Sequence, residues 1–299
     1  MIRLYKLYHL VVLLYIWSNS NVQAQSLELF NVDYTHAPQQ TNMEYNRIKV
    51  LGRIPVKLKK ENTYFIPGVR YNYHTLQLQS DEVLMESPQK FHTIAVNALY
   101  TTPVKNGWGF TLGGEAIASS DFSKGEITNE ELFYTTYFLF IKKKTAANEQ
   151  QTSKWILGLH MTIPFDVFAP LPIISYYKKF HPNWSYTVGT PISNLSFYCK
   201  KKSVLKMYLG LDRFYATMQH VNTLPVGAAQ QERINSTSMF MVLGALSYEY
   251  YITEHLLLYA DVGYTIDNEI RWINTDQENL KILSDENTVY LKTGLKFKI

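Results

Sequence analysis

The sequence ends in a segment whose side chains alternate in character almost residue by residue. Because the side chains of a strand point alternately to its two faces, one face of this segment would be apolar and the other cationic. The apolar positions are Val289, Leu291, Leu295, Phe297 and Ile299, and the positions opposite are Lys292, Gly294, Lys296 and Lys298. A strand of this kind needs a partner strand and an apolar surrounding.

The first 24 residues have the features of a secretory signal peptide. Arg3 and Lys6 provide a positive start, residues 10–17 are apolar, and Ala24 ends a small-x-small cleavage site. The apolar run is too short for a membrane anchor, which needs about 18 residues or more. We predict a signal peptide over residues 1–24, followed by one domain over residues 25–299.

The rest of the chain alternates in segments that are long for a soluble protein. Strands of globular proteins usually have about 5 or 6 residues, whereas about 9 to 11 tilted residues cross a bilayer. The 23 tyrosines, 15 phenylalanines and 5 tryptophans would supply the aromatic girdles of a membrane barrel. The predicted strands are residues 27–35, 44–58, 63–78, 90–103, 107–119, 131–142, 153–165, 171–180, 184–200, 203–218, 233–251, 254–270 and 288–299.

These features predict an all-β fold: an antiparallel up-and-down transmembrane β-barrel of about 12 strands, within a range of about 10 to 14. Tight hairpins are predicted at residues 105–107 and 181–183, and long connections within residues 218–233 and 267–287. Strand counts from the two ends differ by one strand between Asn106 and Lys200. We assign this difference to the proline-rich residues 163–172. With short turns facing the periplasm, the carboxy terminus would be periplasmic.

Charged residues of several predicted strands would point into the lumen. The lumen cations would be Arg47, Lys49, Arg53 and Lys57, and the acidic partners would be Glu115, Asp212, Glu249, Asp261 and Asp267. A ring of cations can select anions. Alternatively, cations and carboxylates pair with one another and fill a narrow barrel. The pattern also fits an unidentified ligand in the lumen.

Little in the sequence indicates catalysis. It contains no G-x-S-x-G elbow, H-E-x-x-H metal helix, C-x-x-C pair, P-loop or dinucleotide glycine pattern. We therefore predict no catalytic residue, metal site or cofactor. His74 and His160 would be polar residues of the lumen. The single cysteine, Cys199, permits no internal disulfide. The mature chain would have 27 basic and 25 acidic residues, which gives no indication of nucleic-acid binding.

Partners are suggested by the predicted membrane location. Lysine clusters at residues 142–144 and 200–202, each at a strand end, could bind lipid phosphates or lie solvated in turns. We expect outer-membrane lipid and lipopolysaccharide to surround the barrel. The barrel-assembly machinery would insert it, although Phe297 is third from the end of the chain. The oligomeric state is left open.

Two neighbouring segments in the middle of the chain carry a family resemblance. Residues 170–177 contain a P-x-P strand, and residues 184–191 follow after a short hairpin with a G-x-P strand. This order resembles a family of uncharacterised bacterial outer-membrane β-barrel proteins. The resemblance implies a barrel over most of the mature chain and implies no activity or site residue.

The sequence therefore predicts a non-enzymatic protein of the bacterial outer membrane. It would be a small, porin-like passive pore or a structural or surface-interaction barrel. The alternative is a membrane-embedded hydrolase acting on lipid or lipopolysaccharide, which would need a serine and a histidine at the same depth on adjacent strands.

Overall fold

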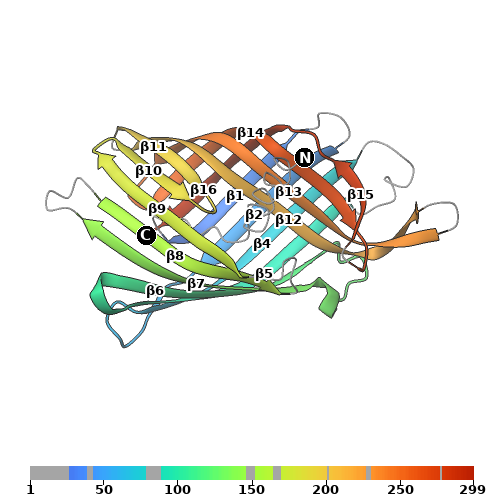
Figure 1. Cartoon of the computed structure of the whole chain (residues 1–299), viewed down its shortest axis with the longest axis horizontal. Coiled ribbons are helices and arrows are strands. Elements are labelled where there is room, and N and C mark those ends of the chain that lie inside the picture. The colour runs from blue at the N-terminus through green and yellow to red at the C-terminus, as the bar shows by residue number, and fades with distance from the viewer. Residues whose placement is uncertain are drawn as a thin grey trace, which may run out of the picture.

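The computed structural model of the 299-residue chain describes residues 27–38, 43–78, 89–145, 152–163, 170–200, 202–226, 230–276 and 278–299. The predicted signal peptide lies outside these ranges. Fourteen strands form a closed antiparallel barrel (Figure 1). Within the described ranges, no helix is both long and apolar enough to span a bilayer.

The barrel strands follow the chain in order around the wall. They are β1 (Glu28–Ala37), β2 (Met43–Arg53), β4 (Tyr64–Leu78), β5 (Lys90–Pro103), β6 (Trp108–Ser120), β7 (Leu132–Thr145), β8 (Thr152–Ile163), β9 (Leu171–His181), β10 (Trp184–Gly189), β11 (Ser193–Lys200), β12 (Ser203–Val226), β13 (Gln230–Tyr251), β14 (Leu256–Ile273) and β16 (Val289–Lys298). The short strands β3 (Val56–Lys57) and β15 (Asn279–Ser284) pair with β4 and β14, and the single turns η1 (Lys105–Gly107) and η2 (Asn129–Glu131) are 3-10 helices.

The carboxy-terminal strand closes the barrel. β16 pairs with β1 on one side and with β14 on the other. At the edge of the β1 pairing, Leu27 and Ile299 exchange two backbone hydrogen bonds of 3.1 Å. Lys296 and Tyr290 lie inside, whereas Leu291 lies outside. The predicted fold class is confirmed, and so is the use of the terminal strand to close it.

The strand number corrects one predicted boundary. The predicted strand over residues 184–200 is two strands, β10 and β11, joined by a tight turn. Gly189 has a φ of 134°, which a side chain disfavours, and its N–H donates to Ser193 Oγ at 3.0 Å. The extra strand lies within the interval left open between Asn106 and Lys200. It arises at this G-x-P turn and not at residues 163–172. The hairpin predicted at residues 105–107 is confirmed.

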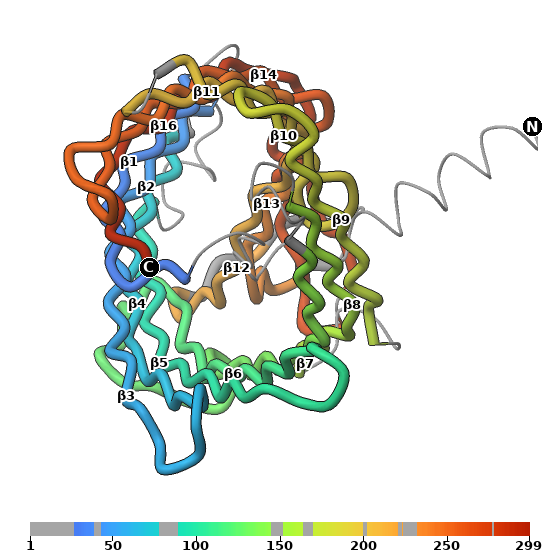
Figure 2. Tube along the Cα trace, turned by 90° about the vertical axis from the view of Figure 1, so that its left-hand side faces the viewer, coloured from blue at the N-terminus to red at the C-terminus, as the bar shows by residue number. Residues whose placement is uncertain are grey.

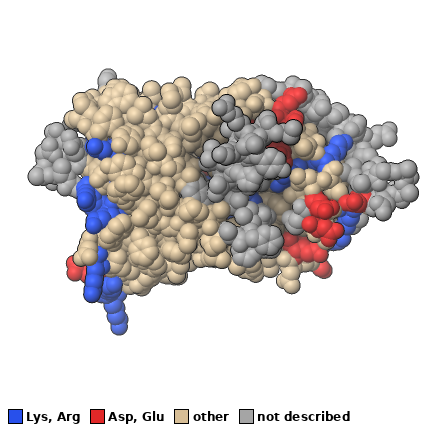
Figure 3. Space-filling view, viewed as in Figure 1, with Lys and Arg blue, Asp and Glu red and all other residues tan. Residues whose placement is uncertain are grey.

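The two ends of the barrel differ in their connections and in charge. We call the end with the turns at residues 105–107, 181–184 and 251–256 the short-turn end, and the opposite end, where β12 and β13 extend furthest, the long-hairpin end. In Figure 3, Lys and Arg gather at the short-turn end, and Asp and Glu lie together with further Lys and Arg at the long-hairpin end, on either side of a broad uncharged band. This distribution suits a wall that crosses a membrane between two aqueous surfaces.

Aromatic side chains lie on the outer surface near both ends. Near the short-turn end, the rings of Trp155 and Tyr176 are 4.5 Å apart, and those of Trp184 and Phe197 are 4.7 Å apart. Nearer the long-hairpin end, Tyr34 and Tyr134 are exposed. Amphipathic rings at these levels match the interfaces of a bilayer.

An irregularity in β14 reverses the direction of its side chains. The register with β13 shifts between the pair that contains Asp267 and the pair that contains Thr265. Such a bulge moves the following residues to the opposite face. Thr265 and Asn268 are therefore both buried, and Asp267 is exposed. The prediction that Asp267 lies in the lumen is wrong.

β12 leaves the wall of the barrel halfway along its length. Its pairing with β11 ends at Leu209, and Thr217 then pairs with Ser120 of β6 on the other side of the interior. Figure 2, which looks into the barrel from the short-turn end, shows β12 and β13 crossing the interior behind the mouth. A smaller closed ring forms at the level of the pair between Thr217 and Ser120. Its strands, in order, are β6, β5, β4, β2, β1, β16, β14, β13 and β12.

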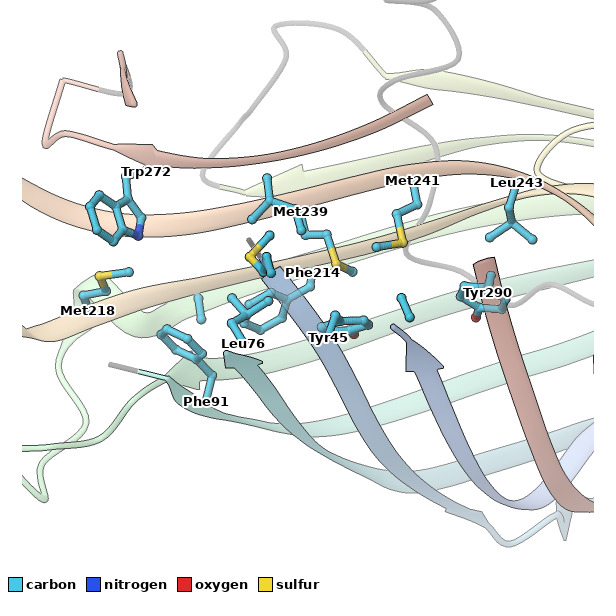
Figure 4. Packing of buried hydrophobic residues seen from close by; sticks show 14 of the residues in the cluster. Tyr45, Leu76, Phe91, Phe214, Met218, Met239, Met241, Leu243, Trp272 and Tyr290 are labelled. Carbon is cyan, nitrogen blue, oxygen red and sulfur yellow. The ribbon is translucent and has the colours of Figure 1, made fainter. Parts of the chain in front are cut away.

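The smaller ring encloses a hydrophobic core (Figure 4). Its centre contains Phe214 of β12, Met239 and Met241 of β13 and Trp272 of β14, all buried. On the opposite side of β12, Leu211 packs against a second cluster formed by Leu139, Ile156, Leu171 and Ile173. The residues predicted as a long connection, 218–233, are instead mostly the ends of β12 and β13. β12 therefore has apolar packing on both faces.

Candidate functional site: the interior of the barrel

An ion pair links opposite parts of the interior. Arg47 Nη1 of β2 lies 2.6 Å from Asp212 Oδ1 of β12, and both side chains are almost fully buried. Tyr290 of β16 donates a 2.7 Å hydrogen bond to Asp212 Oδ2, and Arg47 Nη2 donates to Thr35 Oγ1 at 3.1 Å. Asp33 lies 3.9 Å from the same guanidinium. This cross-lumen bridge ties β12 to the wall formed by β1, β2 and β16.

The other three predicted cations have different surroundings. Lys49 is buried beside Asp33. Arg53 Nε donates to the Asn97 side chain at 3.1 Å, so a neutral amide and not a carboxylate is its nearest partner. Lys57 is exposed in β3, beyond the interior. The structure thus places only part of the predicted cationic row in the lumen, and Lys57 does not belong to it.

Three predicted acidic residues lie in the interior with partners of their own. Glu115 accepts two hydrogen bonds from Arg70, of 3.0 and 2.8 Å. Glu249 pairs with Lys206 at 2.5 Å. Asp261 accepts from the Tyr208 hydroxyl at 3.0 Å. The alternation of the strands indicated these interior positions, but Arg70 and Lys206 were not predicted as their partners.

The crossing segment, residues 214–219 of β12, is fastened to the latch loop, residues 121–131. The Gln219 side chain donates to the Glu126 carbonyl at 2.6 Å and to the Glu131 carboxylate at 3.0 Å, and accepts from the Lys124 N–H at 2.9 Å. Its backbone N–H donates to Asp121 Oδ1 at 2.7 Å. A buried amide with this many partners fixes one position of the segment.

Ser119 and Ser120 at the end of β6 make further contacts with the crossing segment. Their hydroxyls donate to the carbonyls of Tyr215 and Thr217, at 2.7 and 2.9 Å. These bonds satisfy backbone acceptors of β12 where it has left β11, and an unpaired carbonyl there would be costly. No local pattern indicated these hydrogen bonds, because the partners are nearly 100 residues apart in the sequence.

The stability of the contact between the crossing segment and the latch loop should depend on pH through Glu131. Burial raises the pKa of this loop carboxyl, but hydrogen bonds from Gln219 and Thr128 outweigh burial and hold the pKa below its usual value. Because the folded pKa is the lower one, the stabilisation is present above the unfolded pKa of about 4.3 and is lost as the pH falls through the folded pKa. We expect hydrogen exchange at the backbone N–H of Gln219 to accelerate as the pH falls over that range.

The exchange measurement has a matched control on the neighbouring residue. Glu131→Gln should remove most of the acid dependence, and Glu130→Gln, at an exposed position, should retain it. If the Glu131→Gln variant shows the same acid dependence as the wild type, another group controls the contact between the crossing segment and the latch loop.

A small cavity of about 60 Å³, lined by both polar and apolar side chains, lies between the crossing segment and the wall. Arg70, His74, Thr93 and Arg213 are among its lining residues. His74 Nδ1 is 3.0 Å from the Tyr45 hydroxyl, and its ring is stacked on Phe214 at 4.1 Å. These contacts make His74 part of the packing between the crossing segment and the wall.

Among the described residues, no histidine ring is hydrogen-bonded to a serine hydroxyl, the pair that the hydrolase alternative would need. The histidine rings make hydrogen bonds with tyrosine, asparagine, threonine and backbone groups. His160 is buried in the interior of β8. In the same part of the chain, no three His, Cys, Asp or Glu residues are grouped so that they could hold a metal ion.

Solved structures similar to this chain have low sequence identity to it. The NanC porin is 8% identical with a TM-score of 0.37, and the alignment covers 90% of this chain and 100% of that one. LpxR from Salmonella typhimurium is 6% identical with a TM-score of 0.38, at the same coverages. The beta domain of the Bordetella autotransporter BrkA is 6% identical with a TM-score of 0.37, covering 92% and 100%. Curated proteins gave no match.

The family comparison covers the whole barrel. Residues 28–298 match the family described as a domain of unknown function, DUF6268. This span begins at the first residue of β1 and ends at the last residue of β16. The resemblance to an uncharacterised barrel family is therefore confirmed, and the chain belongs to the DUF6268 family.

Proposed function

We propose that this protein is a non-enzymatic barrel of the bacterial outer membrane that acts as a structural or surface-interaction protein and not as an open passive pore. The observation that carries the proposal is the path of β12. Its crossing segment leaves the wall, bonds to β6 and packs Phe214 into the hydrophobic core, and Leu211, just before this segment, packs against the second cluster on the opposite side of β12. Solutes moving along the lumen would have to displace this packed strand.

The long-hairpin end supplies a surface for interaction. β12 and β13 extend beyond the ring at this end (Figure 1), and acidic and basic side chains lie there together (Figure 3). The outer membrane as the location is supported by the uncharged band and by the aromatic side chains on the outer surface. Membrane fractionation tests this location: recovery of the protein in a lipid-free soluble fraction would contradict it.

Conductance tests whether the lumen is closed. We expect the wild-type protein in planar bilayers to show no steady conductance, because the crossing segment blocks the interior. A Ser119→Ala, Ser120→Ala, Gln219→Ala variant lacks most of the side-chain hydrogen bonds that fasten this segment and should show current fluctuations. Steady, open-channel conductance of the wild-type protein would overturn the proposal in favour of a pore.

A lipid-hydrolysis assay tests the enzymatic alternative. Purified protein is incubated with phospholipid and lipopolysaccharide in mixed micelles, and released acyl chains are measured. We expect no turnover above a heat-unfolded control. Turnover that is lost in the His160→Ala variant would replace the proposal with a membrane-embedded hydrolase.

A further inference from the structure

Two lysines face each other inside the barrel near the short-turn end. Lys143 of β7 and Lys154 of β8 are direct partners in the antiparallel ladder. The alternation that buries Leu139 of β7 and Ile156 of β8 places both ammonium groups on the interior side. Like charges directly opposite each other in a sheet are destabilising.

A third lysine and two tyrosines extend this cluster along the wall. Tyr177 of β9 is the ladder partner of Lys154, and Lys179 lies two residues further along β9 on the same face. Lys179 Nζ is 5.1 Å from the centre of the Tyr198 ring. The Tyr198 hydroxyl is 3.1 Å from Ser185 Oγ. Ammonium groups and hydroxyls therefore share one side of the mouth.

The cluster differs from the ion-paired interior cations in lacking carboxylates. Arg70 has Glu115, and Lys206 has Glu249. Among the described residues, no carboxylate forms an ion pair with any of the three lysines of β7, β8 and β9. A bound anion would offset the repulsion between these lysines. Lys143 is exposed and Lys154 and Lys179 are half-buried, so an anion can reach them from the mouth.

We propose that Lys143, Lys154 and Lys179, together with the hydroxyls of Tyr177 and Tyr198, bind a phosphate-type oxyanion at the short-turn mouth of the barrel. Three ammonium groups and two hydroxyls offer several charge-assisted donors, which suits an acceptor with several oxygens and more than one negative charge. The phosphate can belong to a soluble phosphate compound or to a lipid headgroup at the membrane surface. The site does not depend on whether the lumen conducts.

Calorimetric titration with pyrophosphate tests the site. The folded, detergent-solubilised protein is titrated in a zwitterionic detergent at constant ionic strength. Lys143→Gln, Lys154→Gln, Lys179→Gln should weaken binding by at least about tenfold, because three charged donors are lost. The matched control is Lys142→Gln, Lys144→Gln, Lys178→Gln, which changes neighbouring lysines on the outer faces of β7 and β9 and should bind as the wild type does.

Thermal unfolding gives a second readout from the same variants. In chloride, the interior triple variant should unfold at a higher temperature than the wild type, because repulsion between the lysines has been removed. Pyrophosphate should raise the unfolding temperature of the wild type and of the control, and leave that of the interior variant unchanged. Absence of pyrophosphate binding to the wild type, or equal weakening in both triple variants, would overturn the proposal.

Nanodiscs distinguish the two sources of phosphate. Pyrophosphate binding is compared in phosphatidylcholine discs and in discs that also contain phosphatidylglycerol. If phosphatidylglycerol weakens pyrophosphate binding, and this effect requires the three interior lysines, a lipid headgroup is the occupant. If pyrophosphate binds equally well in both kinds of disc, the occupant is a soluble phosphate compound. If the phosphatidylglycerol effect instead requires the outer-face lysines, and the interior variant binds pyrophosphate normally, the site is on the membrane surface and the proposal is wrong.

Discussion

Asp212→Ala should lower the free energy of unfolding by about 3 kcal/mol, because it leaves the buried guanidinium of Arg47 without its closest carboxylate. Breaking a buried ion pair by removing one partner costs about 3–5 kcal/mol. We expect the lower end of this range, since Asp33 lies 3.9 Å from Arg47 and offsets part of the lost interaction. Urea unfolding in lipid vesicles, followed by tryptophan fluorescence, measures the change.

Two variants make this test specific to the cross-lumen bridge. Asp267→Ala removes an aspartate that is exposed on β14 and should leave the stability almost unchanged. The double variant Arg47→Leu, Asp212→Leu removes both charges and should recover most of the loss, because no buried charge is left unpaired. If the Asp212→Ala variant is as stable as the wild type, the cross-lumen bridge does not hold β12 in the interior.

Phe214→Ala should destabilise the barrel by about 3–5 kcal/mol and also make it leak ions, because a buried aromatic side chain is replaced by a cavity. The Phe214 ring is stacked on His74 and lies edge-on to Phe91 at 5.4 Å, so it joins the crossing segment to β4 and β5. Urea unfolding and planar-bilayer conductance give the two measurements.

The control for this variant lies on the outer surface. Phe140→Ala removes a ring that is 40% exposed on β7, and should cause a smaller loss of stability and no ion leak. Lower stability of Phe214→Ala without a leak would show that packing by this ring is not what closes the lumen.

The alternation of the sequence predicted the faces of the strands wherever one face meets the outer surface. In β16, the outward position of Leu291 and the inward position of Lys296 follow directly from the period of two. The pattern lost its predictive value in β14 after Ile266, because a bulge adds one residue and reverses the faces. No feature of the residues around Asp267 indicated this bulge.

The path of β12 could not be predicted from local pattern. In β13, the neighbouring residues Thr237, Ser238, Met239 and Phe240 are all buried, so no contrast remains between an inner and an outer face. The hydrogen bonds that direct β12 across the interior join Ser120 and Thr217, which are far apart in the sequence. The observed 14 strands lie within the predicted range of 10 to 14. The strand predicted over residues 184–200 was not divided into β10 and β11, because the turn at Gly189 was interpreted as continuous strand.

The seam between β1 and β16 has a consequence for the order of folding. Each of the other neighbouring pairs of the main ring joins strands close together in the sequence, whereas this seam joins strands about 260 residues apart. Closing so long a loop costs about 4 kcal/mol more in chain entropy than closing a four-residue hairpin, at about 0.6 kcal/mol for each doubling of length. We therefore expect hairpins to form first and the seam last, so that exchange of Leu27 and Ile299 amides reports on completion of the barrel.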